Sequence, residues 1–158
     1  MPLDLATLNA DLVELATNPT DSFAGQAAAW AGANENHVKG IIPILVDEGA
    51  AATVVLEAQL VTAFTAMAEE GATPAGNAVL LEAAFVQYAA QLIIPPNRDP
   101  LYTHVVPPAP VGFAPLFAAG ASQTIEEFAT SFSSLIDIWM KTGTSTLIAP
   151  PFTVVNWS

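Results

Sequence analysis

The spacing of hydrophobic and polar residues predicts helices over most of this chain. Leucines at positions 5, 8, 12 and 15 recur with a helical period, and acidic residues lie between them. Side chains three, four and seven positions apart share one face of a helix, so the pattern indicates an amphipathic helix. This helix is expected to end near Asn18-Pro19, because proline cannot continue it.

Three further segments repeat the helical period. The second helix is expected to start after a capping Thr20 or Asp21 and to reach about Ile42. The third is expected over about 51–70 and the fourth over about 75–93. The expected apolar faces are Phe23, Ala27 and Trp30 in the second helix, Leu56, Leu60, Phe64 and Met67 in the third, and Leu81, Phe85, Tyr88 and Leu92 in the fourth.

A fifth helix carries the clearest boundary signals. Thr124-x-x-Glu127 is a capping box, in which each side chain satisfies a backbone N–H at the start of the helix. Lys141 complements the negative end of the helix dipole, and Gly143 follows as a stop. The expected apolar stripe of this helix is Ile125, Phe128, Phe132, Leu135 and Trp139.

Two segments depart from the helical pattern. Seven prolines from Pro95 to Pro115 forbid a regular helix and leave few donors for a central strand, so an ordered, extended crossover is expected. The last fifteen residues, TSTLIAPPFTVVNWS, carry no charge, and Pro150-Pro151 bars a long central strand there. Because an apolar tail in water is unfavourable, we expect it to dock on its own domain or to add a strand to a neighbour.

The predicted fold is mainly α, an antiparallel helical bundle of four to five helices with a Pro-rich extended crossover and an extended C-terminal tail. Alanine-rich helices favour this arrangement, because small side chains let helices approach closely. A single helical domain is expected over residues 1–142, with the crossover at 95–121 inside it. Residues 143–158 are expected to form an extended C-terminal docking segment.

Composition changes the expectation for the surface. Hydrophobic residues make up 53% of the 158 residues and charged residues only 11%, whereas an average soluble domain is ~25% charged. The helical stretches are interrupted by Glu57, Glu69 and Glu82, so no membrane span and no membrane partner are expected. The shortage of charged side chains predicts instead a surface that is buried between subunits.

The charge balance and the N-terminus exclude further classes. The chain has three basic and fifteen acidic residues and a net charge of -12, so direct nucleic-acid binding is not expected. The first residues lack the basic region and apolar core of a signal peptide, which favours synthesis in the cytoplasm. The absence of cysteine excludes disulfides and thiolate metal sites.

Candidate chemistry is sparse. The chain lacks the glycine-rich nucleotide loops, the H-E-x-x-H zinc motif, the G-x-S-x-G motif and the EF-hand loop. For His37 and His104, structural roles are favoured over acid–base catalysis with nearby carboxylates. The acidic pairs Asp47-Glu48, Glu69-Glu70 and Glu126-Glu127 are not expected to bind a cation. The sequence therefore predicts a protein that is not an enzyme and holds no metal or cofactor.

The tryptophans leave alternatives open. Trp30 and Trp139 are expected in the core, whereas Trp157, one residue from the end, either anchors an interface or docks within the chain. An alternative function follows if aromatic side chains line a cavity, namely a soluble helical binding module with an apolar ligand pocket. The residues expected to line such a pocket are Phe85, Tyr88, Phe128 and Trp139.

Three runs of sequence, PVGFAPLFAAG, IDIWMKTG and PPFTVVNWS, resemble small structural proteins encoded among the virion genes of tailed bacteriophages. The resemblance covers roughly the last fifty residues, with weaker similarity in the alanine-rich helices. It implies a virion component present in many copies, in the neck, tail, baseplate or capsid surface, and it transfers no catalytic residue.

Composition and resemblance together predict a non-enzymatic structural subunit of a multi-copy assembly in the virion, synthesised in the host cytoplasm. Self-association and contacts with other virion proteins are expected, with lateral packing of the helical body and engagement of a neighbour through the C-terminal segment. Deleting Ala149 to Ser158 is expected to leave a helical fold and to abolish assembly. The candidate interface residues are Phe113, Phe117, Ile148, Phe152, Val154, Val155 and Trp157.

Overall fold

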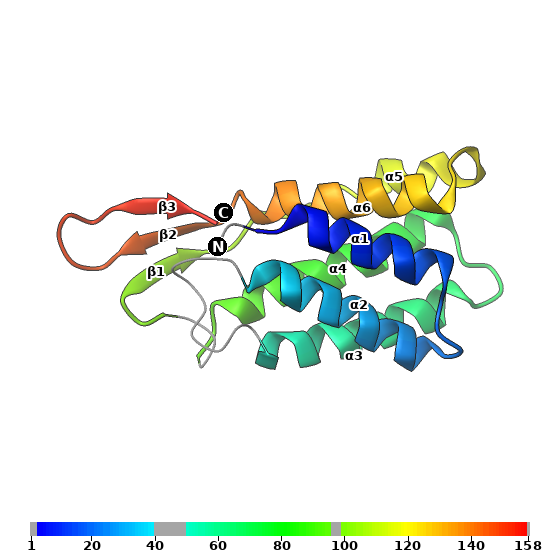
Figure 1. Ribbon diagram of the computed structural model, residues 1–158, viewed down its shortest axis with the longest axis horizontal. Coiled ribbons are helices and arrows are strands. Elements are labelled where there is room, and N and C mark those ends of the chain that lie inside the picture. Colours follow the sequence, from blue (N-terminus) through cyan, green and yellow to red (C-terminus); the bar gives the residue numbers. More distant parts are fainter. Residues whose placement is uncertain (1–2, 40–49, 96–98, 158) are drawn as a thin grey trace.

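The computed structural model describes residues 3–39, 50–95 and 99–157, and this part of the chain is mainly helical with a small sheet (Figure 1). The helices are α1 (Leu5–Thr17), α2 (Phe23–Val38), α3 (Ala50–Met67), α4 (Pro74–Leu92), α5 (Ala114–Ala119) and α6 (Ile125–Met140). The strands are β1 (Tyr102–Val105), β2 (Thr144–Leu147) and β3 (Val154–Asn156), and a 3-10 turn, η1 (Gly120–Ser122), follows α5.

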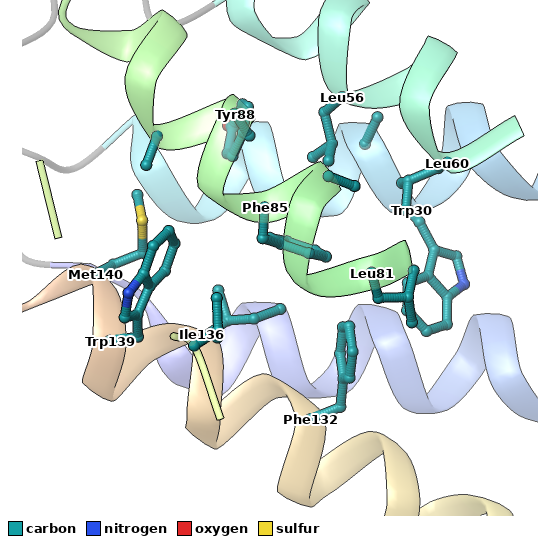
Figure 2. Packing of buried hydrophobic residues seen from close by; sticks show 14 of the residues in the cluster. Trp30, Leu56, Leu60, Leu81, Phe85, Tyr88, Phe132, Ile136, Trp139 and Met140 are labelled. Atoms are coloured by element: carbon teal, nitrogen blue, oxygen red, sulfur yellow. The ribbon is translucent and has the colours of Figure 1, made fainter. Parts of the chain in front are cut away.

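The five long helices lie side by side along the long axis of the molecule (Figure 1). α1 packs against α2 and α6, while α3 packs against α2 and α4. A cluster of aromatic and aliphatic side chains fills the space between them (Figure 2). Within it, Phe132 stacks on Phe113 at a centroid distance of 4.6 Å and meets the edge of Trp30 at 5.1 Å. This aromatic cluster ties α6 to α2 and to the crossover.

Side-chain caps explain where the helices begin. The side chains of Asp4, Ser22, Thr73 and Thr124 each accept a hydrogen bond from a backbone N–H in the first turn of α1, α2, α4 and α6. These bonds satisfy donors that a helix start otherwise leaves without a partner. The capping box predicted at the start of α6 is confirmed. The cap of α2 is Ser22, so the prediction of Thr20 or Asp21 is wrong.

The helix ends agree with expectation less closely. α3 ends at Met67, three residues before the predicted end, and Gly71 follows with a φ of 90°. α2 ends at Val38, and the end predicted near Ile42 lies outside the described residues. The crossover predicted to be extended over 95–121 contains α5, so the prediction of extended structure is wrong there. Pro115 lies in the first turn of α5, where its missing N–H removes no helical hydrogen bond.

The predicted apolar faces differ in accuracy between helices. In α4, all four predicted residues are buried, whereas Phe23 of α2 and Ile125 of α6 are exposed. The buried face of α6 is Ala129, Phe132, Ser133, Ile136, Asp137, Trp139 and Met140. Part of this face meets α1, where the Ser133 hydroxyl donates to Asn9 Oδ1 over 3.1 Å. The spacing of hydrophobic residues predicts which face of a helix is apolar, but it does not predict which other element packs against that face.

α3 is an apolar outer helix. Among the described residues, it is the one helix long and apolar enough to cross a membrane by length and composition, and 22% of it is buried within the fold. The expectation that no segment meets this requirement is therefore wrong for α3. Alanine and valine raise its hydropathy despite Glu57. Core helices of soluble proteins can pass the same requirement, and α3 packs against helices on two sides.

The Pro-rich crossover is held against the helices by two side chains. The Glu82 carboxylate on α4 accepts hydrogen bonds from three consecutive backbone N–H groups, those of Val111, Gly112 and Phe113. On α6, the indole Nε1 of Trp139 donates to the carbonyl of Pro108 over 2.7 Å. These contacts fix the crossover as an ordered segment draped over the helices, as its apolar composition predicts.

The crossover and the C-terminal residues form one antiparallel sheet of order β1-β2-β3. β1 pairs with β2, with Tyr102 opposite Leu147, and β2 pairs with β3, with Ser145 opposite Val155. The prediction of an extended C-terminal segment is confirmed, but β2 is a central strand. β2 lies before Pro150-Pro151 and retains its backbone donors, which is why it can occupy the centre of the sheet.

Trp157 docks on its own chain. Its side chain is fully buried against Gly143, and its Nε1 donates to Ser145 Oγ over 3.2 Å. Its backbone N–H donates to the carbonyl of Gly143 over 2.9 Å. The alternative of docking within the chain is therefore the one that the structure adopts.

Candidate functional site

The sheet projects beyond the ends of the helices (Figure 1). Side chains alternate across it, so Thr103, Val105, Thr144, Thr146, Val154 and Asn156 share the outer face. The opposite face holds residues that are at least partly covered, among them the fully buried Ser145. The strands and the β2–β3 connection contain no charged residue. The outer face is thus an uncharged surface at one end of an acidic chain.

Large apolar side chains are exposed on this projecting sheet. Five of them are more than half exposed, and burying such surface is favourable by about 25 cal/mol per Å². Exposed apolar side chains that gather on one element are typical of a site where another molecule binds. The five residues are Leu101, Val105, Ile148, Phe152 and Val154.

A serine and a histidine pair on the covered face of the sheet. His104 Nε2 donates to the carbonyl of Asp99 over 3.2 Å, which leaves Nδ1 to accept from the Ser145 hydroxyl over 2.9 Å. The Ser145 oxygen also accepts from Trp157, and the residue has no exposed surface. A nucleophile must reach its substrate, so this arrangement is typical of a structural clamp rather than of a catalytic pair.

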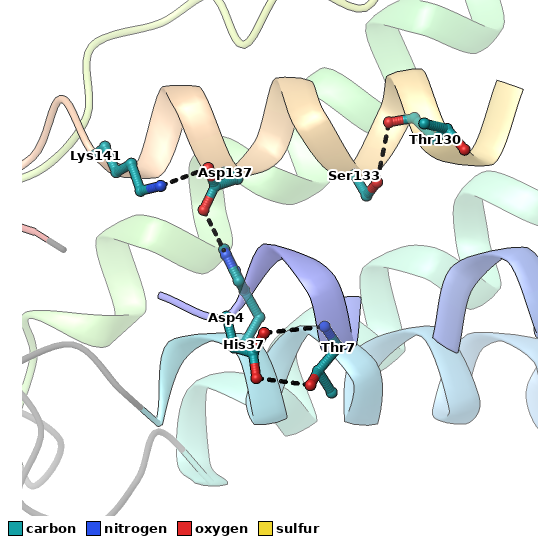
Figure 3. A network of polar contacts seen from close by, with 7 residues as sticks. All are labelled: Asp4, Thr7, His37, Thr130, Ser133, Asp137 and Lys141. Atoms are coloured by element: carbon teal, nitrogen blue, oxygen red, sulfur yellow. Dashed lines mark hydrogen bonds and ion pairs between the residues drawn. The ribbon is translucent and has the colours of Figure 1, made fainter. Parts of the chain in front are cut away.

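A second polar network is buried between α2 and α6 (Figure 3). His37 Nε2 lies 3.1 Å from Asp137 Oδ1, and Lys141 Nζ lies 2.7 Å from Asp137 Oδ2. His37 is fully buried and Asp137 is 2% exposed, whereas the Lys141 side chain reaches solvent. His37 Nδ1 has no hydrogen-bond partner among the described residues. Hydrophobic spacing does not predict this pairing, because the two residues are 100 positions apart.

Burial lowers the pKa of His37, and the hydrogen bond and charge of Asp137 oppose this only in part. Lys141 lowers the pKa further, and Asp4, the N-cap residue of α1, raises it slightly. The histidine is therefore neutral in the folded protein near pH 7, with Nε2–H donating to the carboxylate. A neutral, fully buried histidine without access to substrate has a structural role.

The pKa of His37 predicts how stability depends on pH. Because the folded-state pKa lies below the unfolded value of about 6.5, the unfolded state takes up a proton first as the pH falls. We expect the free energy of unfolding to decrease from pH 6.5 toward pH 5, by at most about 1.4 kcal/mol per pH unit. Urea unfolding of the wild type and of His37→Gln at pH 7, 6 and 5 measures this. An identical pH dependence in the two proteins would contradict the assignment.

A pocket of about 740 Å³ opens at the end of the molecule opposite the sheet, between the α1–α2 connection, the end of α3, α5 and the start of α6. Its lining is mostly apolar. Trp30 is 7% exposed, and its Nε1 has no hydrogen-bond partner among the described residues. The aromatic lining residues are Phe23, Trp30, Phe64, Phe117 and Phe128.

The predicted site residues fall into three groups. Phe113 and Trp157 are fully buried in the chain's own core, so their side chains have no surface for a neighbour, while Val155 is half-buried on the covered face of the sheet. Phe117 lies in the pocket. The residues that the structure places on the exposed part of the sheet are Ile148, Phe152 and Val154.

The pocket differs from the one predicted for the alternative function. Of the four residues expected to line it, only Phe128 does, because Phe85, Tyr88 and Trp139 are buried in the core. Among the described residues, no three His, Cys, Asp or Glu side chains form a group that could hold a metal ion. Glu127 serves the capping box, Glu69 and Glu70 are exposed beyond α3, and Asp47-Glu48 lie outside the described residues.

These elements define a mainly helical protein with a projecting antiparallel sheet at one end and an apolar pocket at the other. Comparison of the chain with protein-family models, with curated proteins and with solved structures finds no match in any of the three.

Proposed function

We propose that this protein is a non-enzymatic structural subunit of a multi-copy assembly. The assembly in this proposal is the virion of a tailed bacteriophage, and the subunit is synthesised in the host cytoplasm. The observation that carries the proposal is the uncharged sheet with exposed apolar side chains that projects from an acidic chain. Two copies with a net charge of -12 repel each other in general. On the uncharged sheet a second copy can approach with less of that repulsion.

The helical body supplies a second surface for packing. It forms an antiparallel bundle in this proposal, and α3 presents an apolar outer face on which Val54 is 67% exposed. Val79 on the neighbouring α4 is equally exposed. Burying these side chains between adjacent copies would explain why so few charged residues are present. Lateral contacts between helices and end contacts through the sheet then act together in the assembly.

The alternative enzymatic function has less support. Both histidines have partners, but His37 is fully buried and His104 is joined to a buried serine. The pocket at the opposite end is lined by neither histidine, and the one ionisable side chain among its lining residues is Asp21. A soluble module that binds an apolar ligand remains the second candidate function, because the pocket is large and apolar.

Substituting Ile148 tests the proposed role of the sheet. Ile148 is 55% exposed in the β2–β3 connection, and Ile148→Glu adds a charge to the uncharged surface. We expect this variant to shift the assembly of purified protein to monomers, as measured by light scattering over a range of protein concentrations. The matched control is Ile138→Glu on α6, where the isoleucine is 64% exposed and the added charge is the same.

Comparing Ile148→Glu with Ile138→Glu separates loss of assembly caused by a charge on the sheet from loss caused by added net charge. Equal loss of assembly in both would assign the effect to net charge, and a wild type that stays monomeric at high concentration would contradict the proposed function. Deleting Ala149 to Ser158 is a less specific test, because it also removes the buried Trp157 and the strand β3.

A further inference from the structure

The two ends of the molecule carry complementary features. The β2–β3 connection, residues 148–153, extends from one end, and all six residues are exposed (Figure 1). We call this segment the hairpin tip. The pocket opens at the other end of the same long axis, next to the α1–α2 connection. A protrusion and a hollow at opposite ends can join identical copies head to tail.

One residue that lines the pocket carries a buried donor. Among the described residues Trp30 Nε1 has no hydrogen-bond partner, and in Figure 2 it lies on the side of the indole ring turned away from Leu81 and Phe132. Edge contacts with Phe64 at 5.6 Å and Phe132 at 5.1 Å hold the ring in place. A buried N–H without a partner costs ~1–3 kcal/mol, so an occupant that offers an oxygen there is favoured.

The charge of the pocket restricts its occupant. Asp21 is at the rim, and no basic residue lines the pocket, so an anionic occupant would be repelled. Gln26 is already engaged, because its side chain donates to the carbonyl of Leu15 and accepts from the backbone N–H of Thr20. Besides Thr20 and Ser22, the remaining lining residues are apolar or aromatic. The pocket therefore suits a neutral, apolar occupant that carries a hydrogen-bond acceptor.

The hairpin tip has this chemistry. Its sequence, Ile-Ala-Pro-Pro-Phe-Thr, is uncharged, and its two prolines lack N–H groups, so it offers more backbone acceptors than donors. Grooves lined by aromatic side chains are a common binding site for proline-rich segments. Phe152 is 58% exposed on the tip and has a positive φ of 53°. The side chain of Phe152 is thus available to enter an aromatic pocket.

We propose that the hairpin tip of one copy inserts into the aromatic pocket of the next copy, with a backbone carbonyl of the tip accepting from Trp30 Nε1. This inference rests on the proposed function and names the partner as a second copy of the chain. The contact joins two different surfaces, so repetition produces a ring or an open filament rather than a closed pair. Six residues are fewer than the ~20–30 per side of a standard interface, so single contacts are weak and assembly depends on protein concentration.

Two variants, each defective at one end, test the contact. Phe152→Asp damages the tip, and Ala68→Glu places a charge in the pocket at an exposed position where folding is spared. We expect each variant alone to be monomeric. Mixed together, they are expected to form a 1:1 pair that does not extend, because one intact tip meets one intact pocket. Native mass spectrometry of the mixture measures this, and Ala83→Glu, at an exposed position of α4 outside the pocket, is the matched control.

Removing only the N–H donor of Trp30 is expected to weaken self-association without abolishing it. Trp30→Phe retains an aromatic ring but lacks the N–H, and the loss of one hydrogen bond is expected to weaken self-association by up to about tenfold. Far-ultraviolet circular dichroism confirms that the variant is folded. Sedimentation velocity at several protein concentrations measures the change in association.

The outcomes distinguish the inference from the proposed function. If the wild type assembles and Ala68→Glu assembles equally well, the tip-in-pocket contact is wrong while the structural role stands. The same conclusion follows if the mixture of the two variants forms no pair, or if native mass spectrometry finds a small apolar molecule in the pocket of the wild type. A wild type that does not self-associate at any concentration contradicts both.

Discussion

Replacing Trp157 with alanine is expected to lower the free energy of unfolding by about 3–5 kcal/mol, the range for deleting a large buried aromatic side chain. The indole is fully buried, packs against Gly143 and donates to Ser145 Oγ. Urea unfolding followed by circular dichroism measures the loss.

Two further variants define the cause. A side chain at position 143 would overlap the Trp157 ring, so Gly143→Ala is expected to destabilise the protein although it leaves no cavity. The exposed neighbour supplies the control, because Asn156→Ala is expected to change stability by less than about 0.5 kcal/mol. A Trp157→Ala protein as stable as the wild type would mean that the C-terminal residues dock elsewhere in solution.

Replacing Asp137 with alanine is expected to destabilise the fold by about 2–3 kcal/mol, because the buried Nε2–H of His37 is left without an acceptor. The lost ion pair with Lys141 contributes less to this destabilisation, because the Lys141 side chain reaches solvent and the pair is partly exposed. Thermal and urea unfolding of the variant at pH 7.5, where the histidine is neutral, measure the effect.

A double substitution distinguishes the polar contribution of His37 and Asp137 to stability from their contribution to packing. In His37→Leu with Asp137→Leu, both members of the buried pair are removed together, so neither leaves the other without its partner, and stability is expected to recover most of the loss. If the double variant is as unstable as Asp137→Ala, the cost arises from packing and not from the orphaned donor. The His37–Asp137 pair would then stabilise the fold only through the packing of its side chains.

The most accurate sequence predictions concern local structure. The capping box at Thr124 and the apolar face of α4 depend on residues within one or two turns, and local spacing determines them. The prediction for α6 is less accurate, because its buried face includes Asp137. One signal was present: Asp137 is an acidic residue in the last turn of a helix, where the dipole disfavours negative charge. Such a position indicates a partner from elsewhere in the fold.

The candidate sites were harder to predict, because they combine segments far apart in the chain. The pocket brings together five separate parts of the sequence, and only Phe117 and Phe128 among the earlier candidate site residues line it. His104 and Ser145 meet because β1 pairs with β2 across 41 positions. Hydrophobic spacing shows that a residue is apolar and on which side of an element it lies. It does not show which other element lies opposite.

By itself, the sequence determined where the main helices lie, that the last fifteen residues are uncharged and extended, and that the chain is too poor in charge for an ordinary exposed surface. The tertiary structure decided what those residues contact. It placed Trp157 inside the chain's own fold, left Ile148 and Phe152 exposed on the same hairpin, and put an aromatic pocket at the opposite end. The physical reason is that local spacing fixes the direction of side chains, whereas burial depends on the packing of segments distant in sequence.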